Sequence, residues 1–387
     1  MMSYTLRLPL VVIALIVALT YGVPPAQAIE TLAKQAVLMD ADTGTILYEK
    51  EADVPMPPAS MSKLMTVFMI FERLRDGRLS LDDTFSVSEN AWRKGGAKSG
   101  SSTMFLEPGK RVRIEDLIRG IVIQSGNDAC IVIAEGISGS EEAFAEEMTV
   151  RGRQIGLTGS TFKNSTGWPN SEHRMSPKDL ATLAKLLVQN FPEYYHFFSE
   201  KSFVYNGIKQ SNRNPLIYKD MGADGLKTGH TQESGYGLTA SATRGDRRLL
   251  LVVNGLPSKK ERSREPERLL EWGFREFGNY VLLGAGEIVE NAPVWLGTEP
   301  SVSLMIENEL KLTLPKKARS AMKVTVIYQG PIPAPVKKGD KLAILSVSAP
   351  GEKTVEIPLV ATADVEQLGL IGRLMAAFKY IIFGGAS

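Results

Sequence analysis

The chain carries two places where apolar runs flank a tight turn. Residues 36–48 are mostly apolar on both sides of an Asp-Thr-Gly turn, and residues 236–253 repeat the pattern around Arg-Gly-Asp. An apolar run on each side of a turn predicts a β-hairpin. We therefore expect one hairpin at residues 36–48 and another at residues 236–253, at the two ends of a long intervening region.

Between the hairpins the apolar residues follow a helical period. They recur at intervals of three and four at Leu64, Val67, Phe68, Phe71 and Leu74. Further helices are predicted at residues 114–124, 127–135, 141–156 and 259–277. Hairpins at both ends of a helical middle imply one antiparallel sheet with helices packed against it.

The pattern of apolar residues changes after residue 283. Short apolar runs, divided by Gly, Pro and Asn, predict a small all-β domain with strands at residues 302–306, 310–314, 323–328 and 342–345. Residues 368–383 then form an apolar helical segment, interrupted by Arg373 and Lys379, that is too short to span a bilayer comfortably. An amphipathic helix in the membrane interface fits this segment, and a helix docked on the β domain is the alternative.

The first 28 residues predict a signal peptide. Arg7 precedes an apolar run at residues 8–19, and Ala-Gln-Ala at residues 26–28 is a small-x-small cleavage site. The alternative is an uncleaved anchor helix, but the run is shorter than the roughly 20 residues that span a bilayer. Export from the cytoplasm follows from this prediction.

Composition excludes several classes of protein. A length of 387 residues predicts more than one domain, because single cores rarely grow that large. The net charge of 45 − 43 = +2 gives no electrostatic footprint for nucleic acid. The only cysteine, Cys130, lies in an apolar stretch and is predicted to pack in the core, and the three histidines have no zinc-ligand spacing. We expect neither a metal nor another cofactor.

With so few histidines, lysine has to be considered as a catalytic base. Ser60 and Lys63 form an S-x-x-K motif at the start of a predicted helix, which places hydroxyl and amine on one helical face. Lysine accepts a proton only when neutral, and burial beside a second cation would lower its pKa. The motif alone is weak evidence, because Ser60 could be an ordinary helix cap and Ser320 to Lys323 repeats the pattern.

Two further motifs strengthen this interpretation. Ser125-Gly-Asn127 places polar residues inside an apolar helical region, although a turn between helices would look the same. Lys227-Thr228-Gly229-His230 offers a cation and a hydroxyl for a carboxylate, with a glycine that lets substrate lie close to a strand. The alternative for residues 227–230 is a polar edge strand.

In the order S-x-x-K, S-x-N and K-T-G, these motifs resemble the penicillin-recognising serine enzymes. The chain is most similar to the low-molecular-mass penicillin-binding proteins that are D-alanyl-D-alanine carboxypeptidases. The resemblance implies an α+β fold of the serine β-lactamase/transpeptidase type, an antiparallel sheet with a helical cluster, followed by a small all-β domain and a C-terminal amphipathic helix. We expect the signal peptide at 1–28, the catalytic domain at 29–283, the β-rich domain at 284–365 and the anchoring helix at 366–387.

The same resemblance assigns roles to residues. Ser60 would attack the carbonyl between two D-alanines, Lys63 would take its proton, Ser125 would relay a proton to the leaving amine, and backbone N–H groups of Ser60 and His230 would form the oxyanion hole. The expected catalytic residues are Ser60, Lys63, Ser125 and Asn127. The expected substrate-binding residues are Lys227, Thr228, Gly229, His230 and Arg213, although Arg213 could instead form a structural ion pair.

The implied partners are the peptidoglycan stem peptide, β-lactam antibiotics and the periplasmic face of the cytoplasmic membrane, with no nucleic acid. Two alternatives stay open. A β-lactamase would need a glutamate that activates water, and Glu172 is the nearest candidate. A non-catalytic wall-binding protein could keep the fold, although intact Ser60, Lys63 and Lys227 argue against it.

Overall fold

The computed structural model describes residues 29–383. The predicted signal peptide at residues 1–28 lies outside the described residues, as do residues 384–387. Every helix and strand named below belongs to the compact unit Thr31–Ser387.

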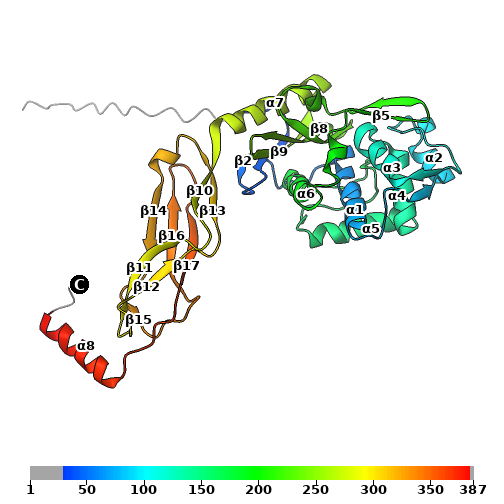
Figure 1. Cartoon of the computed structure of the whole chain (residues 1–387). Helices are drawn as coiled ribbons and strands as arrows, with labels where there is room; N and C mark the ends of the chain where they lie inside the picture. The colour runs from blue at the N-terminus through cyan, green and yellow to red at the C-terminus, as the bar shows by residue number, and fades with distance from the viewer. Residues whose placement is uncertain (1–28, 384–387) are drawn as a thin grey trace, which may run out of the picture. The chain divides into compact units, whose positions relative to one another are not determined.

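A five-stranded antiparallel sheet organises the larger part of the chain, with strand order β2-β1-β9-β8-β7. Strands β2, β8 and β9 of this sheet are labelled in Figure 1. Both predicted hairpins are present in the sheet, and they meet because β1 pairs with β9, for example Val37 with Val252. The strands are β1 (Gln35–Asp40), β2 (Ile46–Lys50), β7 (Ala223–Thr231), β8 (Gly235–Arg244) and β9 (Arg247–Leu256). The prediction of one antiparallel sheet built from both extremes of this region is therefore confirmed.

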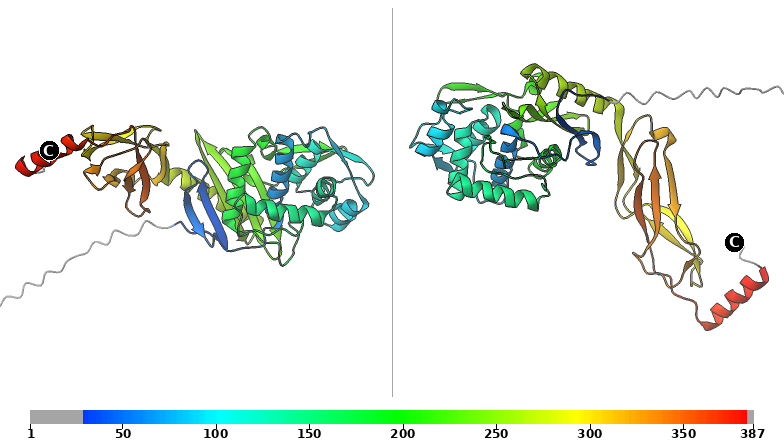
Figure 2. Two further views of the ribbon diagram at one scale, coloured as in Figure 1. Left: turned by 90° about the horizontal axis from the view of Figure 1, so that it is seen from below. Right: turned by 180° about the vertical axis from the view of Figure 1, so that it is seen from behind.

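Helices cover both faces of this sheet. Val37 and Val252 point into the core formed with the helical cluster, whereas Leu38 and Leu249 contact α7 on the opposite face, as the period of two in a strand requires. The helical cluster contains α1 (Lys63–Arg75), α2 (Glu89–Gly95), α3 (Ile114–Arg119), α4 (Asn127–Ser138), α5 (Glu141–Gln154) and α6 (Pro177–Asn190), and α7 spans Lys259–Glu276. Figure 2 shows the sheet between α7 and the other helices.

Short elements complete this region. Serine caps begin several helices, since Ser140, Ser176 and Ser258 each accept a hydrogen bond from the backbone N–H three residues later. The small strand pairs are β3 (Thr84–Ser86) with β4 (Arg111–Arg113) and β5 (Ser202–Tyr205) with β6 (Ile208–Ser211), and short turns are η1 (Ala59–Ser62), η2 (Ala97–Ser99), η3 (Gly120–Gln124), η4 (Tyr195–Phe198) and η5 (Pro215–Tyr218).

The helix predicted at residues 114–124 is not a uniform α-helix. It is α-helical only as far as Arg119 and continues as the π-helical turn η3. Gly120 in this turn lies so close to Met104 that a Cβ atom there would be 2.2 Å from the methionine sulfur. The wider π turn ends at Gln124, directly before Ser125, and such turns are frequent at functional sites.

The predicted all-β region is confirmed. Its six-stranded sheet has the order β14-β16-β17-β12-β11-β15, and a two-stranded sheet pairs β10 with β13. The strands are β10 (Phe277–Leu283), β11 (Ile288–Trp295), β12 (Ser301–Met305), β13 (Leu310–Pro315), β14 (Lys323–Ile327), β15 (Ile332–Pro333), β16 (Lys341–Ser348) and β17 (Val355–Ala361), with the turn η6 at Arg319–Ala321. The predicted boundary after residue 283 stays a prediction, and β10, which ends there, pairs with β13.

The last described element is helix α8 (Leu370–Phe383), seen in red in Figure 1. It leaves six large apolar side chains exposed: Leu370, Ile371, Leu374, Met375, Phe378 and Ile381. Within residues 29–383, no helix is long and apolar enough to cross a membrane.

Candidate active site

Ser60 and Lys63 lie where the turn η1 runs directly into α1. Ala59, just before the serine, has a φ of 48°, so the chain turns sharply into the helix and leaves Ser60 half-buried. The Nζ atom of Lys63 is 2.9 Å from the Oγ atom of Ser60. The predicted pairing of hydroxyl and amine one helical turn apart is therefore present.

Lys63 is fully buried and surrounded by oxygen atoms. Besides Ser60, its Nζ donates to Asn127 Oδ1 at 2.7 Å and to the backbone carbonyl of Thr166 at 2.5 Å. Burial lowers the pKa of Lys63 to about 8, and the positive charge of Arg213 contributes to the decrease. A substantial share of this amine is therefore neutral just above neutral pH.

The second motif lies at the junction of η3 and α4. Ser125 adopts the left-handed conformation with a φ of 65°, and Asn127 is the first residue of α4. Among the described residues, the buried Oγ atom of Ser125 has no hydrogen-bond partner. Such an unpartnered hydroxyl is free to bond a substrate or a reaction intermediate.

Asp128 anchors this junction to the preceding loop. Its buried carboxylate accepts hydrogen bonds from Thr103 Oγ1 at 2.5 Å and from the backbone N–H groups of Met104 and Leu106 at 3.0 and 3.1 Å. The loop before β4 is therefore fixed against the start of α4. No pattern in the sequence indicated this role of Asp128.

The third motif lies on β7, against the turn that carries Ser60. A Cβ atom at Gly229 would be 2.9 Å from the carbonyl oxygen of Pro58, so only glycine lets the strand approach this closely. Lys227 is buried and donates to the carbonyl of Thr228 at 3.2 Å. Burial, together with the charges of Lys63 and Arg213, holds the pKa of Lys227 well below its usual range.

The remaining predicted residues lie further out. Thr228 is buried, whereas His230 is exposed and its ring packs at a tilt against Tyr236 with centroids 4.0 Å apart. Arg213 is exposed and donates to Ser102 Oγ at 2.5 Å, so within the described part of the chain it forms a hydrogen bond and no ion pair. Its charge nevertheless acts on both active-site lysines.

A second arginine, which no sequence motif indicated, lies beside β7. Arg262, on α7, approaches the carbonyl oxygen of Gly229 at 3.5 Å, and its guanidinium lies 5.5 Å from the ring centre of Tyr236. Burial lowers the pKa of Arg262, which places a partly desolvated cation near the K-T-G strand. In the sequence it is one of several charges on an amphipathic helix, and nothing distinguishes it from its neighbours.

Other candidates from the sequence do not join this cluster. Ser320 and Lys323 are exposed in the β-rich region, where Ser320 Oγ donates to the carbonyl of Lys317. Cys130 is buried, as predicted, and its burial raises the pKa of the thiol to about 12. Glu172 is largely exposed and pairs with Lys163 at 3.1 Å.

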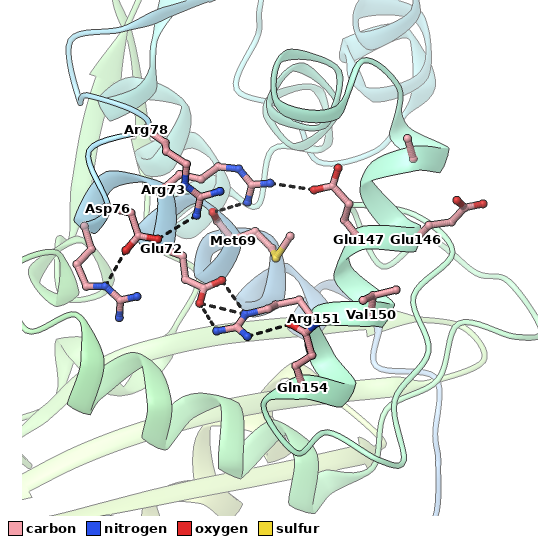
Figure 3. A pocket seen from close by; sticks show the side chains of 12 residues that line it. Met69, Glu72, Arg73, Asp76, Arg78, Glu146, Glu147, Val150, Arg151 and Gln154 are labelled. Carbon is pink, nitrogen blue, oxygen red and sulfur yellow. Dashed lines mark hydrogen bonds and ion pairs between the residues drawn. The ribbon is translucent and has the colours of Figure 1, made fainter.

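A groove between α1 and α5, with a volume of about 710 Å³, is separate from these residues (Figure 3). Each of its four arginines forms an ion pair: Arg73 with Glu147, Arg151 with Glu72, and both Arg75 and Arg78 with Asp76. Over residues 29–383, no cluster of His, Cys, Asp and Glu could hold a metal ion.

An antiparallel sheet with a helical cluster, and a serine hydroxyl beside a buried lysine at the start of a helix, define the class of penicillin-recognising serine hydrolases. Comparison with known proteins identifies the family. A model of the D-alanyl-D-alanine carboxypeptidase family matches residues 23–258, and one of the C-terminal domain of penicillin-binding protein 5 matches residues 277–367. The chain belongs to the D-alanyl-D-alanine carboxypeptidase family, whose members act in cell-wall metabolism.

Individual relatives agree over most of the chain. The D-alanyl-D-alanine carboxypeptidase DacC of Escherichia coli strain K12 is 36% identical over 345 residues, which are 88% of this chain and 86% of that protein. DacF of Bacillus subtilis strain 168 is 35% identical over 350 residues, 88% and 87% of the two chains. The structure of penicillin-binding protein 5 from Haemophilus influenzae aligns with a TM-score of 0.78 at 34% identity, covering 88% of this chain and 99% of that one.

Proposed function

We propose that this carboxypeptidase removes the terminal D-alanine of peptidoglycan pentapeptide stems through an acyl-enzyme on Ser60. The observation that carries this proposal is the position of Lys63 Nζ, 2.9 Å from Ser60 Oγ and buried among three oxygen atoms. The family and the relatives support the substrate class, and the geometry supports the nucleophile and its base.

The three oxygen atoms around Lys63 suit a base. As an ammonium it donates to Ser60, Asn127 and Thr166. A neutral amine keeps two hydrogens and gains one lone pair. With its hydrogens on Asn127 Oδ1 and the Thr166 carbonyl, its lone pair faces the Ser60 hydroxyl and can take that proton.

The reaction then has two steps. Ser60 Oγ gives its proton to Lys63 and bonds to the carbonyl carbon between the two D-alanines. The C–N bond breaks as the departing amine takes a proton from Ser125, and Lys63 replaces that proton. Water then attacks the resulting ester and gives a proton to Lys63, which passes it to Ser60 Oγ as the ester C–O bond breaks. In this proposal the backbone N–H groups of Ser60 and His230 stabilise the oxyanion, where one such donor is typically worth about 3 kcal/mol.

Cations at the edge of the active site, such as Arg213 and Arg262, suit a substrate that ends in a carboxylate. We assign Thr228, Arg213 and the newly found Arg262 to that carboxylate, and Lys227 to the electrostatics around Ser125. A β-lactam carries a carboxylate in a similar place, so we expect it to acylate Ser60 covalently and to be released slowly. A relative that is 28% identical and covers 64% of this chain, penicillin-binding protein D2 of Listeria monocytogenes, has been solved in its ampicillin-bound form.

The direct test is Ser60→Ala. The variant should lose labelling by fluorescent penicillin and should release no D-alanine from a pentapeptide stem, as followed by mass spectrometry. Ser320→Ala is the matched control, because it alters the other S-x-x-K motif and should keep both activities. Persistent labelling of the Ser60 variant would contradict the assignment.

The geometry disfavours the β-lactamase alternative. Such an enzyme needs a buried glutamate that activates water, whereas the side chain of Glu172 is 70% exposed and bound to Lys163. Glu172→Gln should therefore leave penicillin release as slow as in the wild type. Fast penicillin turnover with no D-alanine release would favour the alternative.

We also propose where the enzyme works. The signal-peptide pattern supports export, and the exposed apolar side chains of α8 support attachment to the outer face of the cytoplasmic membrane. The division into a catalytic domain at 29–283, a β-rich domain at 284–365 and a terminal helix at 366–387 belongs to the same proposal.

A further inference from the structure

The loop between α5 and α6 supplies one of the three oxygen atoms around Lys63. The carbonyl oxygen of Thr166 accepts a hydrogen bond from Lys63 Nζ at 2.5 Å. Without this carbonyl, the neutral amine of Lys63 would donate to Asn127 Oδ1 alone. It could then rotate, and its lone pair would have no fixed direction. The direction of the Thr166 carbonyl therefore helps to decide where the lone pair of Lys63 points.

Asn164 orients this part of the loop. Its Oδ1 accepts from the backbone N–H groups of Thr166, Gly167 and Trp168 at 3.2, 2.7 and 3.1 Å, and from the Thr166 hydroxyl at 3.0 Å. Its Nδ2 donates to the carbonyl of Trp168 at 3.1 Å. One side-chain amide thus holds the peptide groups on both sides of Thr166, including the one whose carbonyl meets Lys63.

The neighbouring residue is anchored independently of Asn164. The N–H and the hydroxyl of Ser165 donate to Glu141 Oε1 at 3.1 and 2.8 Å, and Thr66 Oγ1 donates to the Ser165 carbonyl at 2.7 Å. The loop would therefore stay attached to α1 and α5 without Asn164. What would be lost is the fixed orientation of the peptide group between Thr166 and Gly167.

We propose that Asn164 is a positioning residue for the reaction: it aims the Thr166 carbonyl at Lys63 and so directs the Lys63 lone pair to Ser60. This inference rests on the proposed role of Lys63 as the base. Asn164 is linked to Lys63 through the backbone of Thr166: Asn164 Oδ1 accepts from the N–H groups of Thr166 and Gly167, and the Thr166 carbonyl accepts from Lys63.

The test compares Asn164→Leu with Asn164→Asp, using the rate of acylation by fluorescent penicillin as a function of pH. Leucine has a similar size but accepts nothing, so the rate at the high-pH plateau should fall by about tenfold to hundredfold. Water would replace the carbonyl and hydrate Lys63, so its pKa should rise and the acidic limb should move to higher pH. Aspartate keeps the acceptor oxygen, so its plateau should stay close to that of the wild type. Its added negative charge should raise the pKa of Lys63 and so move the acidic limb to higher pH.

Asn170→Leu is the control in the same loop, because Asn170 Oδ1 accepts from the backbone of Glu172 at 2.8 Å and is not linked to Thr166. Its plateau and limb should match the wild type. A wild-type plateau and limb in Asn164→Leu would overturn the proposal. The proposal would also be overturned if Asn164→Asp is folded, as judged by thermal melting, but its acylation rate at high pH falls well below that of the wild type. This second outcome can be read even if the leucine variant fails to fold. An unlabelled Ser60 in the wild type would overturn the proposed function, and this inference with it.

Discussion

The backbone of Gly167 lies directly against the carbonyl of Ala59, the residue that precedes the proposed nucleophile. A Cβ atom at Gly167 would be 1.9 Å from that oxygen, and the φ of Gly167 is 79°. Two segments separated by about a hundred residues in sequence are thus in backbone contact at the site. Each therefore restrains the other.

Substitution of this glycine tests that contact. Gly167→Ala should lower the free energy of unfolding by roughly 2–4 kcal/mol, because the new methyl group meets backbone and the positive φ adds strain. Gly77→Ala is the control, since Gly77 has a φ of 71° and a Cβ atom there would have no described atom within 4 Å, so it should show the strain alone. Denaturant titrations of both variants measure the difference, and equal losses would contradict the close contact.

The pKa of Lys63 predicts how acylation depends on pH. Since the neutral amine is the proposed base and its pKa is about 8, the rate should rise as pH increases through about 8 and then level off. Arg213→Gln should move this limb to higher pH, because the positive charge of Arg213 disfavours the ammonium form. A pH series of acylation rates checks both points. A rate that is flat between pH 6 and 9 would count against lysine as the base.

Lys227 is predicted to cost stability. Within residues 29–383, its buried side-chain amine has only the Thr228 carbonyl as a hydrogen-bond partner, and burial holds its pKa well below the usual range. Replacing it, as Lys227→Met, should raise the free energy of unfolding at pH 7 by about 1–4 kcal/mol while slowing acylation. The gain should shrink toward pH 10, because the unfolded lysine then loses its proton and the wild type no longer gives up a charged state on folding. Lys209→Met, at an exposed position, should change stability little.

The proposed attachment through α8 makes a separate prediction. Deletion from Leu368 onward should move the protein from the membrane fraction into a soluble periplasmic fraction. A full-length variant with Leu374→Glu and Phe378→Glu should do the same, because both side chains are exposed and apolar in the wild type. Fractionation with immunoblotting measures both. Retention of either variant at the membrane would contradict an anchoring role for the helix.

The sequence by itself determined the features that depend on local periodicity. Alternating and apolar runs located the two hairpins, and the three-residue spacing of Ser60 and Lys63 placed them on one helical face because a helix repeats every 3.6 residues. The chemistry of their side chains also marked the S-x-x-K, S-x-N and K-T-G motifs as candidates for a catalytic site. The strands β11 and β17 were not predicted, because β-strand patterns depend on cross-strand neighbours that a single segment does not contain.

Only the tertiary structure decided what completes the cluster around Lys63. The Thr166 carbonyl lies 103 residues away in sequence, and every residue has a carbonyl, so no residue type could signal it. Asn164 and Arg262 look like an ordinary loop residue and an ordinary helix charge until the chain folds. Their roles depend on distance and burial, and long-range packing sets both.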